Sequence, residues 1–238
     1  LKAACCTLAE SFETNPAVDV AFTDAVTGAR QIEMLGLAGP YMQITRENLP
    51  DVRGLASIYG LAYLPGPWLE GLQLAKGTGS VANGFESITG QINVELKKPQ
   101  EGERFYFNLY GNQGGRLEAN ANARFELSDK VSTSVLVHGD VINRENDRNE
   151  DDFLDMPTGS AWTAANRWKY SGSDGWNAQA GIKVTNFDRN SGQLSNTSES
   201  GVPLWEANML TRRLEGWAKV GKVFLNRPEA SIGLQLSG

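Results

Sequence analysis

The sequence predicts a mixed N-terminal domain followed by an antiparallel sheet whose strands cross a membrane. Three observations support this fold class. Short, irregular elements fill the chain before Pro99, whereas nearly every segment after Pro99 alternates between polar and apolar residues. The connections on one side of the predicted sheet are all short, and most of those on the other side are long. Period-two alternation is typical of strands with one wet and one dry face.

Composition excludes several classes of function. The formal net charge of −6 argues against a nucleic-acid partner, because phosphate binding needs a basic surface. The chain lacks a run of about 18 apolar residues, so no membrane-spanning helix is expected. This does not exclude strands that cross a membrane, which are only half apolar. His138 is the single histidine. Most His-based catalysis and most metal sites are therefore not expected, and we expect neither an enzyme nor a bound cofactor.

The part before Pro99 reads as a series of short elements. A helix is expected within residues 8–20, where Pro16 stops helical continuation. Residues 49–67 contain many turn residues and no sustained period, which predicts a loop. Glycine and proline separate the remaining segments into short strands. These strands are expected at residues 29–35, 41–45, 68–77 and 88–99.

Seven alternating segments follow Pro99. Residues 116–127 alternate without exception, with Arg116 beginning the polar set and Leu127 ending the apolar one. Each segment is about 9–12 residues long, the length that a tilted strand needs to cross a hydrocarbon layer. The segments are residues 104–111, 116–127, 130–141, 161–170, 175–186, 213–221 and 229–236.

The apolar faces could touch lipid or a protein core. Alanine is frequent on them, whereas a soluble sandwich fills its core with larger side chains to reach native packing density. Aromatic residues lie mostly near segment ends, where interfacial girdles occur in membrane barrels. These residues are Phe105, Trp162, Trp168, Tyr170 and Trp176. The alternative is a soluble antiparallel meander that packs on the first 99 residues, as half of a two-domain, β-rich binding module.

Residues 69–99, "LEGLQLAKGTGSVANGFESITGQINVELKKP", resemble the end of the plug domain of TonB-dependent outer-membrane receptors. In that family a strand leads into a Lys/Arg-Gly turn and a small-residue loop, and a strand of the type Gly-Gly-x-Ile-Asn-Ile then exits toward the barrel. This sequence has Thr89 in place of the first glycine. Residues 31–48 are similar to the preceding strand–loop–strand segment, with Leu35-Gly36 where the family has Arg-Gly. The matching plug positions are Lys76, Gly77, Gly79, Gly84, Gly90 and Asn93.

The resemblance implies an α+β plug domain over residues 1–99, with four strands and short helices. Residues 100–238 would then supply about the first seven strands of a transmembrane β-barrel of about 22 strands. It implies energised uptake of a scarce nutrient, a metal ion or a siderophore-like metal chelate, across the outer membrane of a Gram-negative bacterium. The partners would be outer-membrane lipid, the substrate and the TonB complex. We expect both ends of the chain to be cut, with the signal peptide and the TonB box outside it.

The outward apices of the plug are where a receptor of this kind would first hold its substrate. Their polar and amphipathic side chains could bind a ligand, or they could only pin the plug to the inside of the barrel. The candidate residues are Met34, Arg46, Asn48, Asp51, Arg53, Tyr59 and Tyr63.

Three further features have two interpretations each. Cys5, Cys6 and Met42 could be soft metal ligands, although adjacent cysteines of a strand point to opposite faces and free cysteine is commonly buried. His138 lies on the polar face of its segment, as an ordinary lumen residue or as a contact for passing substrate. Residues 143–155 contain six carboxylates and could bind calcium, but they lack EF-hand spacing and favour a solvated outer loop.

Overall fold

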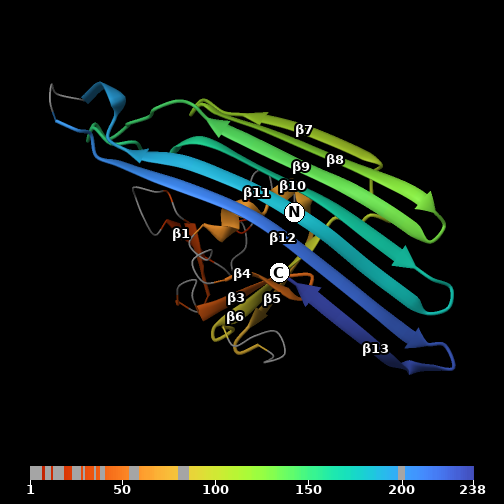
Figure 1. Cartoon of the computed structure of the whole chain (residues 1–238). Coiled ribbons are helices and arrows are strands. Elements are labelled where there is room, and N and C mark those ends of the chain that lie inside the picture. The colour runs from red at the N-terminus through yellow and green to blue at the C-terminus, as the bar shows by residue number, and fades with distance from the viewer. Residues whose placement is uncertain are drawn as a thin grey trace.

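The structure, a computed structural model, describes residues 7–8, 12, 19–22, 28, 30–34, 36–37, 41–53, 59–79, 86–197 and 202–238. Two main sheets organise this part of the chain, a large sheet of seven strands and a small sheet of four. Figure 1 shows the small sheet beneath one face of the large sheet, whose long strands run obliquely across it. Within the described part, no helix is long and apolar enough to span a membrane.

The small sheet has the order β4–β3–β6–β5. Its central strands β3 and β6 are parallel, and the two outer pairs are antiparallel. The strands are β3 (Met42–Arg46), β4 (Leu49–Val52), β5 (Leu69–Lys76) and β6 (Gly90–Leu96). A separate antiparallel pair is formed by β1 (Asp19–Phe22) and β2 (Arg30–Glu33). The four short strands expected before Pro99 are therefore confirmed as β2, β3, β5 and β6.

The large sheet, which we call the wall, has the order β13–β12–β11–β10–β9–β8–β7, and each strand is antiparallel to its neighbour in the chain. All seven alternating segments are confirmed as strands. In the described residues the wall is open, with β7 and β13 at its edges, and it does not close into a barrel. Its strands are β7 (Phe105–Gly111), β8 (Arg116–Ser128), β9 (Val131–Ile142), β10 (Thr158–Ser171), β11 (Trp176–Gly192), β12 (Glu206–Phe224) and β13 (Arg227–Ser237).

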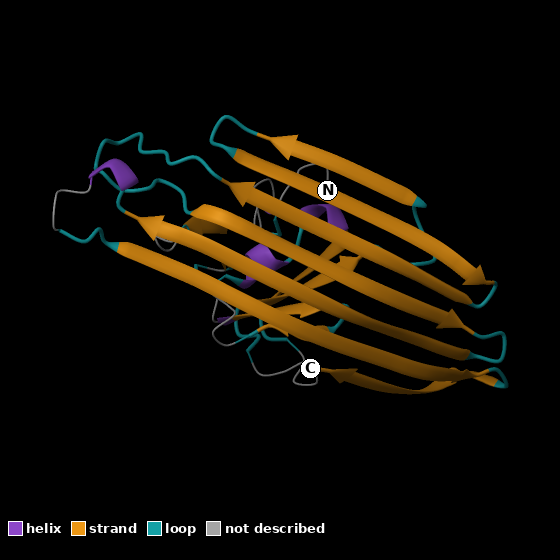
Figure 2. Ribbon diagram, turned by 45° about the horizontal axis from the view of Figure 1, so that its top comes forward, coloured by secondary structure: helices purple, strands orange, loops and turns teal. Residues whose placement is uncertain are grey.

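The connections of the wall differ between its two ends. At one end all three are tight turns, and Gly175 in one of them has a φ of +86° that favours glycine. At the other end the β9–β10 and β11–β12 connections are long, as the sequence predicted, and Figure 2 shows them gathered together. We call these the short-turn end and the long-loop end.

The interpretation of residues 49–67 as loop was wrong. This stretch contains β4 and two 3₁₀ helices, η4 (Gly60–Tyr63) and η5 (Gly66–Trp68). Pro50 lies in β4, which is an edge strand of the small sheet, and an edge position tolerates proline because the missing N–H is not needed there. The helix expected within residues 8–20 and the loop position Gly84 fall mostly or wholly outside the described residues.

The predicted strand length of about 9–12 residues was also wrong for several strands. β11 has 17 residues and β12 has 19. Both continue toward the long-loop end, where most of their outward positions become polar. These positions are Asn186, Asp188 and Asn190 in β11 and Arg212, Asn208 and Glu206 in β12, and the apolar Leu210 is exposed among them. Alternation of hydrophobicity therefore ends while the strand and its hydrogen bonds continue.

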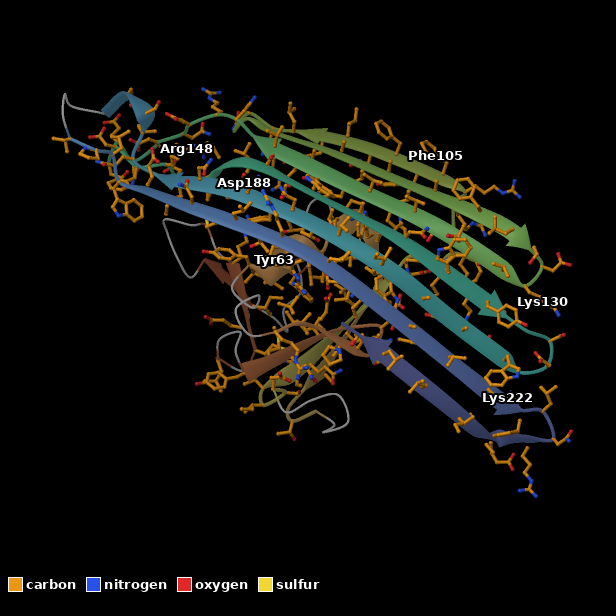
Figure 3. All side chains as sticks on the ribbon, viewed as in Figure 1. Tyr63, Phe105, Lys130, Arg148, Asp188 and Lys222 are labelled. Carbon is orange, nitrogen blue, oxygen red and sulfur yellow. The ribbon has the colours of Figure 1, made fainter. Side chains whose placement is uncertain are left out.

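The two faces of the wall have opposite chemistry. Away from the long-loop end, most outward side chains are apolar; Phe105 is 67% exposed and Leu214 is 69% exposed. Most inward side chains are polar and many of them are buried, among them Asn120 and Lys183 at 1%. The small sheet lies against this polar face, as the sticks in Figure 3 make visible. Its own apolar core includes Ile92 and also two residues of the wall, Leu136 in β9 and Ala165 in β10.

We predict that Ile92→Ala loosens the small sheet. Ile92 is fully buried in β6, and truncation of a buried Ile to Ala costs about 2–5 kcal/mol. Hydrogen exchange of β3 and β6 should become faster in the full-length protein. The control is Leu109→Ala, on the outward face of β7, where the side chain is 67% exposed. Equal exchange in the two variants would contradict this assignment of the core.

Candidate functional site

A tight turn between β3 and β4 places charged groups of the small sheet in contact with the wall. Glu47 and Asn48, its two central residues, have positive φ values of 51° and 61°. This conformation costs a non-glycine residue about 1 kcal/mol or more. Hydrogen bonds fix the turn: the Glu47 amide donates to the Val94 carbonyl at 2.9 Å, and the Asn48 amide donates to Asn93 Oδ1 at 2.8 Å.

Glu47 is held by two cations of the wall. Its carboxylate accepts a hydrogen bond from the guanidinium of Arg167 in β10, and its carbonyl accepts one from the ammonium of Lys219 in β12. The same Arg167 also donates to the backbone carbonyls of Leu96 at 3.0 Å and Lys97. One buried arginine therefore joins the turn and the end of β6 to the wall.

A second group of charges lies beside the turn. The Arg46 guanidinium is 3.6 Å from Glu215 Oε1 in β12 and 3.7 Å from Asp51 Oδ1 in β4. Lys183 Nζ in β11 is 2.9 Å from Glu215 Oε2. Lys183 is 1% exposed, and burying an isolated ammonium would cost much free energy of folding. The negative charges of Glu215 and Asp51 are therefore required to compensate it.

Trp217 supports Arg46 from the wall side. The Arg46 guanidinium carbon lies 4.4 Å from the centroid of the Trp217 ring, a cation–π geometry. The ring in turn lies over Gly181 of β11, where an added Cβ would be 2.2 Å from a ring atom. Gly181 therefore provides the space that lets Trp217 lie against the wall and below Arg46.

The pKa of Asp51 reflects this charged environment. Burial by itself raises the pKa of its carboxyl, but the positive charges of Lys183 and Arg46 outweigh it and lower the pKa from 3.8 to about 2. Asp51 is therefore ionised at neutral pH and contributes negative charge to the group.

Aromatic residues form a second contact toward the long-loop end. The Tyr63 hydroxyl donates to Thr211 Oγ1 of β12 at 3.0 Å, and its ring meets Phe187 of β11 edge-on at 5.7 Å. Tyr59 stacks on the same Phe187 at 6.2 Å. Burial raises the pKa of Tyr63, partly offset by Thr211, so the hydroxyl stays neutral. Figure 3 shows Tyr63 between the small sheet and the wall.

His138 belongs to a polar row across the inward face. Its Nδ1 is 2.8 Å from Asn120 Oδ1 and 3.7 Å from Glu118, and its Nε2 is 3.7 Å from Asp140. Arg189 of β11 reaches over β10 to pair with Asp140. His138 faces inward, as both of its interpretations require, and is 4% exposed.

The other candidate residues are dispersed. Met34 is 1% exposed in the core of the small sheet, so it is not at an accessible apex. Asn48 is exposed at the centre of the turn, and Arg53 is exposed and pairs with Glu86 at 2.7 Å. Arg46 and Asp51 are buried between the sheets, in the pinning arrangement that the sequence left as the alternative.

The proposed metal ligands are not brought together in the part that the structure describes. Cys5 and Cys6 lie outside it, and Met42 is 6% exposed in the apolar core. The described residues contain no group of three or more histidine, cysteine or acidic side chains suited to a metal ion. In the acidic loop, Asp147 accepts hydrogen bonds from the backbone amides of residues 150 and 152, which organises the loop internally.

The motif residues after β5 have structural roles. Gly77 follows Lys76 with a φ of +88°. Gly90 has no space for a side chain, since an added Cβ would be 2.7 Å from the Ala75 carbonyl. Asn93 accepts hydrogen bonds from Thr45 and from the Asn48 amide and donates one to Glu95. It thereby connects β6 to the turn that touches the wall.

Sequence reasoning missed the partners on the wall. Arg167, Lys183, Glu215, Lys219 and Trp217 all lie at inward positions of alternating strands. Their inward orientation was readable from alternation, and Lys183 and Glu215 are direct cross-strand neighbours. Which of them meets the 46–51 hairpin depends on how the two sheets are placed, for which the sequence has no local signal.

Comparison with solved structures identifies the fold. The copper transporter OprC matches with a TM-score of 0.71 at 12% identity, over 97% of this chain. The FrpB iron transporter from Neisseria meningitidis matches with 0.69 at 10% identity over 94%, and the siderophore receptor PiuA from Acinetobacter baumannii with 0.65 at 13% identity over 92%. This chain spans about a third of the length of these proteins, at 34%, 37% and 32%. No protein-family model and no curated protein sequence matches.

The class is therefore defined at the level of fold. The described sheets have the fold of TonB-dependent receptors, which the structures of OprC, FrpB, PiuA and FpvA share. We call the small sheet and its described connections, within residues 41–96, the plug.

We predict that Glu215→Gln weakens the contact between plug and wall. The change leaves Lys183 and Arg46 buried with less negative charge, and breaking a buried pair costs about 3–5 kcal/mol. Hydrogen exchange of residues 46–51 should become faster in the full-length protein. The control is Glu126→Gln in β8, whose carboxylate pairs with Arg124 but is 56% exposed and should have almost no effect. Identical exchange in both variants would refute the contact.

The contact should also weaken in acid. Because the pKa of Asp51 is lowered from 3.8 to about 2 in the folded protein, its ionised form stabilises the contact fully above about pH 5. This stability is lost as the pH falls through about 4 toward 2. The fluorescence of Trp217, taken as the difference between the spectra of the wild type and of Trp217→Phe, should report a transition in that range. Asp51→Asn should remove the transition, and an unchanged transition in that variant would assign it to another group.

Proposed function

We propose that the chain is the plug and the first seven barrel strands of an outer-membrane receptor that takes up a scarce nutrient by TonB-dependent transport. Residues 1–99 would form the plug and residues 100–238 the first part of a barrel of about 22 strands. The observation that supports this most is the arrangement of faces: apolar side chains point away from the small sheet, and buried charges point toward it. A soluble two-domain module would bury the apolar face instead.

The height of the apolar face fits a membrane. In β12 the outward positions from Leu214 to Phe224 are apolar or glycine except for Lys222. From Arg212 toward the long-loop end the outward residues are polar except for Leu210. The stretch from Leu214 to Phe224 measures about 33 Å along the strand, at about 3.3 Å per residue. A tilt of about 45° reduces it to about 23 Å, close to the apolar band of about 25 Å in outer-membrane barrels.

The charged contact suits a plug that must be held and then displaced. Glu47 on the plug contacts Arg167 and Lys219 on the wall, and Asp51 on the plug is stabilised by the positive charge of Lys183 on the wall. Buried ion pairs contribute little net stability relative to apolar packing, because water solvates the separated charges well. Pulling by the TonB complex from the short-turn end would therefore separate the hairpin from the wall and open a path.

The substrate class is part of the proposal. The solved structures with this fold include, by their names, a copper transporter, an iron transporter and a siderophore receptor, which supports a metal ion or a metal chelate. They are transporters and receptors, and we propose no catalytic role for this chain. Arg53 and Tyr59 are the apex residues we assign to substrate contact, with Cys5 and Cys6 as further candidates for a metal cargo.

Growth under nutrient limitation tests this function. We predict that a strain lacking the gene grows more slowly than its parent when iron, copper or zinc is limiting, and that the wild-type gene restores growth. The full-length protein should also migrate differently in gels before and after heating, as membrane barrels do. Normal growth of the deletion strain under metal, vitamin and glycan limitation would contradict the proposed uptake function.

A further inference from the structure

A shallow groove of about 280 Å³ lies on the outward face of the wall, near its short-turn end. Its floor consists of three alanines, Ala178 and Ala180 in β11 and Ala218 in β12. Larger outward side chains border it on both sides, Trp168 and Tyr170 from β10 and Leu234 and Leu236 from β13. We call this feature the alanine groove.

Strand register explains the shape of the groove. Trp168, Ala180, Ala218 and Leu236 are successive neighbours across four strands. The next row toward the short-turn end begins with Tyr170 and has Ala178 as its small residue. Two small positions between an aromatic side and a leucine side leave a depression. Trp168 Nε1 donates to Asn166 Oδ1 at 2.6 Å, so the aromatic side is already oriented.

A cation lies one row beyond the groove, toward the short-turn end. Lys222 is on the same outward face as Ala218, four residues further toward the short-turn end. Its ammonium lies 5.0 Å from the centroid of the Trp176 ring, and the two residues are cross-strand neighbours. Figure 3 shows Lys222 at the short-turn end, near the turn from β12 to β13. A fixed positive charge beside an apolar trough is complementary to an amphiphile with an anionic head.

We propose that the alanine groove binds an anionic glycerophospholipid, with the phosphate on Lys222 and one acyl chain over Ala178, Ala180 and Ala218. This rests on the proposed function, since it requires the outward face to meet lipid. The distance from the Lys222 row to the Ala218 row is about 13 Å along the strand. At a tilt of about 45° it covers about 9 Å of depth, which lies within the about 15 Å of hydrocarbon in one leaflet. Trp176 occupies the headgroup level, where amphipathic rings are favoured.

The test is native mass spectrometry of the full-length protein in detergent, titrated with dimyristoyl phosphatidylglycerol. Lys222→Gln removes the cation, and we expect about fivefold weaker binding, the effect of one cation near an anionic headgroup. Ala218→Phe fills the floor and should weaken binding by a similar factor. The matched controls are Ala164→Phe, an outward position of β10 outside the groove, and Arg148→Gln in a long loop. Both controls should bind as the wild type does.

Several results would overturn the proposal. Equal binding by all five proteins would mean unspecific lipid association, and equal binding of a short alkyl phosphate would remove the role of the acyl chain. A dimer that is lost in Ala218→Phe would assign the groove to a second copy of this chain. Failure of the proposed function itself would appear separately, as a protein that does not shift in gels on heating. A heat-modifiable protein with uniform lipid binding refutes only this inference.

Discussion

The structure depends on how the buried charges of the wall are neutralised. Alternation directs one full face of polar side chains inward, and Lys183 and Arg167 are consequently removed from water. Such charges are tolerated only with well-placed partners. Part of the compensation comes from the wall itself, through Glu215 in β12. The remainder comes from the 46–51 hairpin of the plug, whose Glu47 is held in a strained turn conformation at the point of contact.

This interface differs in kind from the core of the plug. The core packs Ile92, Val94 and Trp68 out of contact with solvent, and its opening would expose apolar surface to water. The interface between plug and wall is mostly ionic and aromatic, with a small apolar contribution from Leu136 and Ala165. Separating it would hydrate charges. Under the proposed function, the plug would keep its own fold while its contact with the wall is released.

Much of this fold could be read from the sequence, because alternation reports directly which way each side chain points. All seven wall strands and four short strands before Pro99 were predicted in place. β4 was missed since Asn48 and Pro50 look like loop residues, and only the pairing with β3 makes an edge strand there. The extensions of β11 and β12 were missed because outward residues such as Asp188 become polar. The charged contact was beyond prediction, since it joins Glu47 to Arg167 across 120 positions of sequence.

The central claim is that the apolar side of the wall faces lipid while its polar side faces the plug. Spin labels on the full-length protein in bilayers test it, with one label at Leu214 on the outward face and one at Thr185 on the inward face. The account predicts that oxygen dissolved in the membrane relaxes the label at 214 strongly and a water-soluble nickel chelate does not, whereas the label at 185 is shielded from both. Relaxation of the 214 label by the nickel chelate, or an immobilised 214 label shielded from oxygen, would contradict it.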